Sequence, residues 1–230
     1  MVGSNRRPKF QTPNRQRIID CAEELFSVSG IDGVSVREIT TKAVVDVSQV
    51  NYYFGTKESL FEEVLIRRVG KMSEARRAKL AGLNLHEKKE VLTPKILTNF
   101  AMPLFGESLL ERHELSNYRK LIALVANSKR WQDVVFKNHY DAVAESYIDA
   151  LCEVNDHLSR DDVCWLFNFF LGSLTNAIAE TGRVDRLSHG SVASNNLDLM
   201  IDRLIKFSSA GFLGMSASAD EGYSILEVAK

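Results

Sequence analysis

The chain has few of the residues that build disulfides, metal sites and membrane anchors. Its 230 residues include three cysteines, four prolines and five histidines, and no cysteine or histidine pair has metal-ligand spacing. No apolar run reaches the ~18–20 residues that cross a membrane, and residues 1–16 lack the apolar core of a secretory signal. We therefore expect a cytoplasmic protein with reduced thiols, no metal, no cofactor and no membrane partner.

Catalytic motifs are also missing. The sequence has no glycine-rich phosphate loop and no G-x-S-x-G nucleophile motif. His113 has glutamates at positions 107, 111 and 114, but acidic residues beside a histidine are common on helix surfaces. We therefore expect no enzymatic activity and no catalytic residues.

The residues that are present favour a globular helical protein. Apolar residues make up 45% of the chain, enough for one or two domains with cores. The net charge of −1 hides a division, because residues 1–79 hold 14 Lys+Arg and 10 Asp+Glu, whereas residues 80–230 hold 15 and 20. A basic front and an acidic rear fit a DNA-facing domain joined to a body held away from DNA.

Residues 34–65 are the stretch around which the rest is organised. Ser35 and Glu38 have the spacing of a capping box for one helix. Asp46 is the expected N-cap of a second helix of about two turns, and Thr56 the expected N-cap of a third. The pattern predicts two short helices joined by a tight turn and followed by a longer helix.

The second of these helices carries amide, hydroxyl and phenol groups where a solvated helix would carry Glu and Lys. Such groups suit base edges and phosphates in a DNA major groove, although a plain surface turn in a helical bundle is the alternative. We predict contacts to base edges or nearby phosphates from Ser48, Gln49, Asn51 and Tyr52, phosphate contacts from Tyr53, Thr56 and Lys57, and support from Arg37.

The segments IIDCAEELFSVSG, VSVREITTKA and VDVSQVNYYFGTKESLF follow one another between residues 14 and 65. In this order, without gaps, they resemble the TetR family of bacterial transcriptional regulators. The resemblance implies an all-α fold, with an N-terminal helix-turn-helix domain and a C-terminal domain that dimerises and encloses a small-molecule pocket. The portion VNYYFGTK is similar to a subgroup in which some members sense acyl chains. Val44 stands where the family usually has glycine, so the turn either keeps a negative φ or is strained.

The remaining organisation follows from helical periodicity, with about nine helices expected in all. Single helices are predicted from Lys57 to about Leu80 and from Trp131 to Val154, with another starting at Thr93 and a loop at 183–193. The predicted segments are a disordered basic arm (1–13), the helix-turn-helix domain (14–65), a ligand-binding and dimerisation domain (66–214) and a flexible tail (215–230).

Aromatic residues gather in the part of the chain where the resemblance implies a ligand pocket. Each aromatic residue taken alone is more often part of a core, yet together they suggest a site for a small apolar ligand, an acyl chain being one option. The predicted lining is Phe100, Phe105, Tyr118, Trp131, Phe136, Tyr140, Tyr147 and Trp165.

The segment FNFFLGSLTNAIAETG is apolar nearly all round, and the last helix also has a wide apolar stripe. Two helices of this kind either lie fully buried in a monomer or pair with their copies in a dimer, and the resemblance favours the dimer. The predicted interface consists of Phe170, Leu174, Ile178, Leu204 and Ile205.

These expectations combine into one functional hypothesis. The chain is predicted to be a sequence-specific regulator, more a repressor than an activator, that binds an inverted-repeat operator on double-stranded DNA as a homodimer and leaves it when a small apolar ligand binds. A dimer is needed because one short helix makes few base contacts, each worth ~1–3 kcal/mol. The alternatives are a DNA-binding regulator without a ligand and a helical protein-interaction scaffold.

Overall fold

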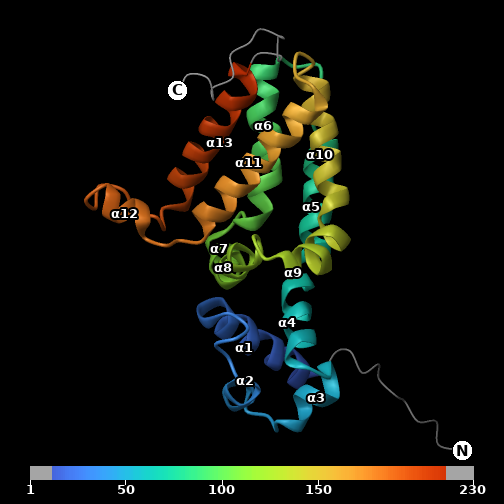
Figure 1. Ribbon diagram of the computed structural model, residues 1–230, viewed down its shortest axis with the longest axis vertical. Helices are drawn as coiled ribbons and strands as arrows, with labels where there is room; N and C mark the ends of the chain where they lie inside the picture. The colour runs from blue at the N-terminus through green and yellow to red at the C-terminus, as the bar shows by residue number, and fades with distance from the viewer. Residues whose placement is uncertain (1–11, 216–230) are drawn as a thin grey trace, which may run out of the picture.

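The protein consists of a small helical unit joined to a larger helical bundle (Figure 1). This computed structural model describes residues 12–215, so nearly all of the predicted arm and tail lies outside the described residues. Within the described range every regular element is a helix, as the sequence predicts, and none is both long and apolar enough to cross a lipid bilayer. The small unit contains α1 (Pro13–Ser29), α2 (Val36–Ala43), α3 (Ser48–Phe54) and α4 (Lys57–Ile66).

The larger unit has more elements than the sequence predicts, because several predicted helices are interrupted. Its long helices pack side by side, whereas α12 extends away from one end of the bundle (Figure 1). The elements are α5 (Val69–Ala81), α6 (Lys89–Ala101), a 3-10 turn η1 (Met102–Leu104), α7 (Leu109–Glu114), α8 (Ser116–Val125), α9 (Lys129–Trp131), a π-helical turn η2 (Gln132–Lys137), α10 (Asp141–Val154), α11 (Arg160–Ile178), α12 (Arg183–Leu187) and α13 (Leu197–Gly214).

Local signals explain most helix starts in the small unit. The capping box of α2 is present, since the Ser35 backbone N–H donates to Glu38 at 2.7 Å and the Glu38 N–H donates to Ser35 Oγ at 3.2 Å. Hydrogen bonds from the Ser35 side chain and backbone to the Glu38 carboxylate lower the pKa of Glu38. Thr56 caps α4 by accepting from the Ser59 N–H at 3.0 Å. The prediction for Asp46 is wrong, because α3 begins one residue later, after Val47, without a side-chain cap.

The helix predicted from Lys57 to Leu80 is broken at Arg67 and Arg68. The Tyr118 hydroxyl donates to the Leu65 carbonyl at 2.8 Å, the oxygen that a continuous helix would bond to the Val69 N–H. Both arginines also turn toward α1, where each lies 3.2 Å from a Glu23 carboxylate oxygen. A tertiary contact therefore divides this helix into α4 and α5.

Three further boundaries differ from the predictions. The segment 131–154 is divided by the π-helical turn η2, and α10 restarts at Asp141. The helix α6 begins at Lys89 rather than Thr93, since the Thr93 hydroxyl bonds to Asn155 in the core at 3.2 Å instead of capping. The predicted loop at 183–193 contains the short α12.

The five residues of the predicted dimer interface lie in the core of the larger unit. Phe170, Leu174, Ile178, Leu204 and Ile205 are all buried within the protomer, where α11 and α13 pack together and α13 also packs against α6. Little of their surface is therefore left to contact a second copy. Larger exposed apolar residues of these two helices are Trp165, Phe169 and Phe207.

Candidate nucleic-acid interface

The turn between α2 and α3 is built around Val44 in a left-handed conformation. Its φ is 54° and its ψ is 53°, so the strained alternative of the two left open by the sequence holds. The Val44 N–H donates to the Thr41 carbonyl at 3.2 Å and the Val45 N–H to the Thr40 carbonyl at 3.0 Å, the bonding pattern of a Schellman helix end. These two backbone hydrogen bonds hold a β-branched residue in a conformation that normally requires glycine.

The helix α3 presents its polar face to solvent and its apolar face to the core. Val50 and Phe54 are buried, whereas Ser48, Asn51 and Tyr52 are exposed. Gln49 and Tyr53 are half-buried. The structure therefore brings these five predicted contact residues together on one short helix whose outer face carries no formal charge.

Two hydrogen bonds, one from the N-cap of α1 and one from its first turn, fix the orientation of α3. Asn14 Nδ2 donates to Gln49 Oε1 at 3.1 Å, and Thr12 Oγ1 donates to the Tyr53 hydroxyl at 2.8 Å. The Tyr53 ring also packs edge-on against Tyr52, with ring centroids 5.0 Å apart. Thr12 and Asn14 are not among the predicted site residues, since no local sequence pattern pairs positions 41 and 35 residues apart.

Lys57 serves a different purpose from Thr56, although both were predicted to bind phosphate. Thr56 is exposed at the α4 N-terminus. Lys57 is half-buried, and its ammonium donates to the Ile31 carbonyl at 2.8 Å and the Val34 carbonyl at 3.0 Å. Lys57 thereby ties α4 to the loop between α1 and α2, and one of its three N–H donors is left over.

The basic residues around α3 differ in whether a carboxylate pairs with them. Arg37 is exposed on α2, and no carboxylate among the described residues pairs with it. Lys42 pairs with Glu24 at 2.8 Å, and Arg15 with Glu63 at 2.6 Å. Of the two basic residues predicted at the site, Arg37 and Lys57, Arg37 is therefore the more available to bind a phosphate.

The eight aromatic residues predicted to line a pocket do not lie together. Trp131 belongs to the core of the small unit, with its ring centroid 4.8 Å from that of Phe61, and Trp165 is 60% exposed on α11. Phe105 is buried in the core of the larger unit, with its ring centroid 5.8 Å from Arg119 Cζ. The remaining five, Phe100, Tyr118, Phe136, Tyr140 and Tyr147, gather where α5, α6, α8 and α10 meet.

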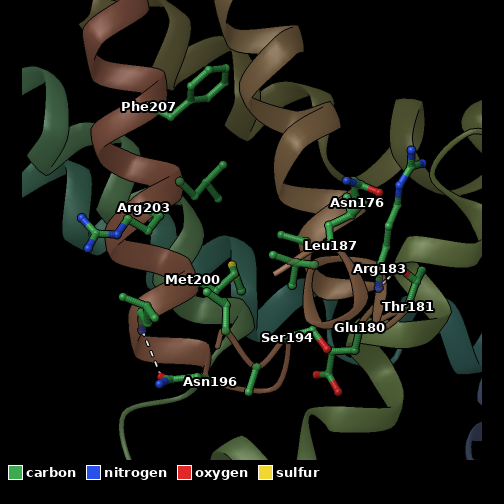
Figure 2. Close-up of a pocket in the computed structure, with 16 residues that line it drawn as sticks. Asn176, Glu180, Thr181, Arg183, Leu187, Ser194, Asn196, Met200, Arg203 and Phe207 are labelled. Carbon is green, nitrogen blue, oxygen red and sulfur yellow. Dashed lines mark hydrogen bonds between the residues drawn. The ribbon is translucent and has the colours of Figure 1, made fainter. Parts of the chain in front are cut away.

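Two grooves in the described part of the chain lie elsewhere. One groove of about 730 Å³ runs between the end of α11, α12 and α13, and Figure 2 shows Leu187 and Phe207 on its opposite sides. A second, of about 460 Å³, lies between α5, η1 and α7, and Gln16 of α1 also lines it. None of the eight aromatic residues lines either groove.

A short polar reading helix, packed on two supporting helices and joined to a large bundle, defines a helix-turn-helix DNA-binding protein. The sequence model described as "Bacterial regulatory proteins, tetR family" matches residues 18–64. The model described as "Tetracyclin repressor-like, C-terminal domain" matches residues 98–211. The chain belongs to the TetR family, whose members are transcriptional regulators rather than enzymes.

Individual relatives agree with this assignment. A Bacillus subtilis (strain 168) protein named "Probable HTH-type transcriptional regulator YttP" is 41% identical over 56 residues, which are 24% of this chain and 27% of YttP. The chain thus matches about a quarter of that curated relative's length.

Solved structures resemble the whole fold. A TetR-family regulator from Shewanella sp. PV-4 has a TM-score of 0.62 at 14% identity, covering 90% of this chain and all of the other. A regulator from Saccharomonospora viridis in complex with choline has a TM-score of 0.57 at 16% identity, covering 86% of this chain and 96% of the other. FadR, a fatty acid degradation regulator from Bacillus halodurans, has a TM-score of 0.53 at 16% identity, covering 86% and 95%.

Proposed function

We propose that this protein is a homodimeric repressor that places two copies of α3 in the major groove of an inverted-repeat operator. The observation that carries the proposal is the uncharged, exposed face of α3, held in place by the bonds from Thr12 and Asn14. Fixed amide and phenol groups read base edges without losing much side-chain entropy on binding. Two copies about 34 Å apart, or a multiple of that distance, would contact successive turns of one DNA face.

In this proposal some side chains of α3 contact bases and others contact phosphates. The Gln49 oxygen accepts from Asn14, which leaves its amide N–H groups to donate to bases. Ser48, Asn51 and Tyr52 flank it and approach base edges or nearby phosphates. Tyr53, with its hydroxyl proton free to donate, contacts a phosphate.

Residues of α2 and of the N-terminus of α4 make further phosphate contacts in this proposal. Thr56 lies at the N-terminus of α4, where backbone N–H groups favour an anion, and Arg37 contributes an unpaired charge from α2. Lys57 contributes mainly by fixing the loop between α1 and α2, with its remaining N–H directed to a phosphate.

A second copy covers the apolar surface that the protomer leaves on α11 and α13. Trp165 and Phe169 are 60% and 58% exposed and lie with ring centroids 5.7 Å apart. Phe207 is 70% exposed on α13, beside the groove of Figure 2. Large exposed aromatic residues are typical of an interface, and pairing of these helices sets the distance between the two reading helices.

A small molecule controls that distance in the proposed mechanism. It must bind the DNA-free arrangement more tightly than the DNA-bound one, since a ligand with equal affinity for both shifts nothing. The similar proteins include one bound to choline and one that regulates fatty acid degradation. These chemistries differ, so the ligand of this chain has to be inferred from its own residues.

Titration of the chain's own upstream DNA in a gel shift tests the proposal. We expect a retarded complex with two protomers per duplex, weakened steeply by salt because phosphate contacts release counterions. The matched control is the same protein with Gln49→Ala and Asn51→Ala, which should lose preference for the specific duplex. Failure to bind any duplex at low ionic strength would contradict the proposal.

A further inference from the structure

Arg76 on α5 is a buried cation without a counter-ion. Only 2% of the residue is exposed, and no carboxylate of residues 12–215 lies within ion-pairing distance of its guanidinium. Burial lowers the pKa of Arg76, and the polar groups that oppose this shift are the three hydroxyls of Tyr118, Tyr140 and Tyr147. A buried, unpaired charge is costly, and arginines in protein interiors normally have an anionic partner.

The protein satisfies only part of this guanidinium. Arg76 Nε donates to the Phe100 carbonyl at 2.9 Å, near the negative end of α6. Its Cζ lies 4.0 Å from the Phe100 ring centroid and 5.7 Å from that of Tyr140. A guanidinium has five N–H donors, so these contacts leave most of them for another acceptor.

A second polar group on the same side of α5 also lacks a partner. The Ser73 hydroxyl is buried, and among the described residues nothing hydrogen-bonds to it. Ser73 precedes Arg76 by three positions and therefore lies beside it on the helix. A buried hydroxyl without a partner, beside a guanidinium that makes only one hydrogen bond among the described residues, marks a place where an acceptor is missing.

We propose that Arg76 and Ser73 receive the carboxylate of an anionic effector at the junction of α5, α6, α8 and α10. This assignment rests on the proposed function and names the chemical class of its ligand. A carboxylate matches a planar guanidinium through two parallel hydrogen bonds. The rings of Phe100, Tyr140 and Tyr147 enclose the apolar part of the molecule next to its charged end.

The second groove supplies the entrance. It is lined by Met72 and Lys79 from α5 and by Met102 from η1. The first two lie about one helical turn from Arg76, and Met102 lies two positions after Phe100. Methionine side chains repack readily, so the two methionines can move aside to admit the ligand. Lys79 pairs with Glu107 at 3.1 Å at the rim, where its charge attracts an anion.

Tyrosine hydroxyls connect this site to the DNA-reading unit. The Tyr118 hydroxyl donates to the Leu65 carbonyl at the end of α4, and its oxygen lies 2.6 Å from the Tyr140 hydroxyl. Since Tyr118 has one proton and gives it to Leu65, Tyr140 is the donor of that second bond. A carboxylate at Arg76 competes for the Tyr140 proton, which loosens the contact that holds the break between α4 and α5.

Thermal unfolding of the purified full chain tests the site without DNA. Sodium decanoate should raise the Tm saturably, by about 2–4 °C, whereas decanol at the same concentration and ionic strength should not. Arg76→Met should abolish the decanoate shift and leave the ligand-free protein at least as stable, because a buried charge is removed. The matched control Arg77→Met alters the exposed neighbour on α5 and should keep the shift.

The opposite results overturn the proposal. A lower Tm for Arg76→Met together with equal responses of wild type to decanoate and decanol would show that Arg76 only holds α6 in place. If Arg76→Met does not fold, Arg76→Lys replaces it as the test. Lysine keeps the charge but cannot make two parallel hydrogen bonds to a carboxylate. An unchanged decanoate affinity in Arg76→Lys would therefore overturn the assignment. Because this readout uses no DNA, a decanoate shift without operator binding would support the anion site and contradict only the proposed regulator.

The coupling has its own test. Tyr118→Phe removes the hydroxyl that bonds to Leu65 and leaves Arg76 in place. It should keep the decanoate shift in Tm while decanoate no longer releases the operator in a gel shift. Normal release by this variant would overturn the connection through the tyrosines.

Discussion

Replacing Val44 by glycine is expected to stabilise the protein. A non-glycine residue held in the left-handed region costs about 1–3 kcal/mol, and Val44 has φ 54°. Glycine loses about 0.5–1 kcal/mol more backbone entropy on folding. The Val44 side chain is 78% exposed, so its removal sacrifices only a few tenths of the ~1.5–3 kcal/mol for a fully buried side chain. The net gain is therefore about 1 kcal/mol, or about 2–4 °C in Tm.

Urea unfolding followed by circular dichroism measures this change, with Val47→Gly as the matched control. Val47 is also an exposed valine beside α3, but its φ is −56°, so glycine relieves no strain there. We expect Val47→Gly to lower the free energy of unfolding by about 0.5–1 kcal/mol. Equal losses in both variants would refute the reasoning, because they would show that the turn stores no strain at Val44.

Two further substitutions test the fold of the reading unit and the dimer. Lys57→Met should destabilise the protein by about 1–3 kcal/mol in urea unfolding, since two hydrogen bonds from a charged donor to the Ile31 and Val34 carbonyls are lost; an unchanged stability would argue that Lys57 acts only on DNA. Phe207→Glu should leave the protomer folded and yield monomers in sedimentation, whereas Leu124→Glu, at another exposed apolar position on α8, should remain dimeric. A Phe207→Glu dimer would place the interface elsewhere.

The helix-turn-helix unit could be predicted from sequence because its signals are local. Ser35 and Glu38 are three residues apart, and their reciprocal bonds form within one helical turn. The outward position of Ser48 and Asn51 follows from the helical period that buries Val50 and Phe54. Neither inference needs knowledge of the rest of the chain.

The errors arose where distant contacts decide. The break after α4 depends on Tyr118, 53 positions from Leu65, and no local pattern reports it. The apolar face of α11 that packs inward could not be chosen, because Phe169 and Phe170 are adjacent and equally apolar while only Phe170 is buried. Arg76 belongs to a run of basic residues that is typical of a solvated helix face, and only the packed bundle shows that Arg76 is enclosed. The run also contains Arg67, Arg68, Lys71, Arg77 and Lys79.

Selection of bound sites from a random DNA pool tests the central claim most directly. Wild-type protein should enrich an inverted repeat whose half-site centres lie one helical turn, about 10–10.5 base pairs, or a multiple of it apart. Gln49→Ala should enrich a repeat altered at the same position in both half-sites, because one amide on α3 is lost from each protomer. Enrichment of no motif, or of one identical for wild type and Gln49→Ala, would contradict the assignment of α3 as the reading helix.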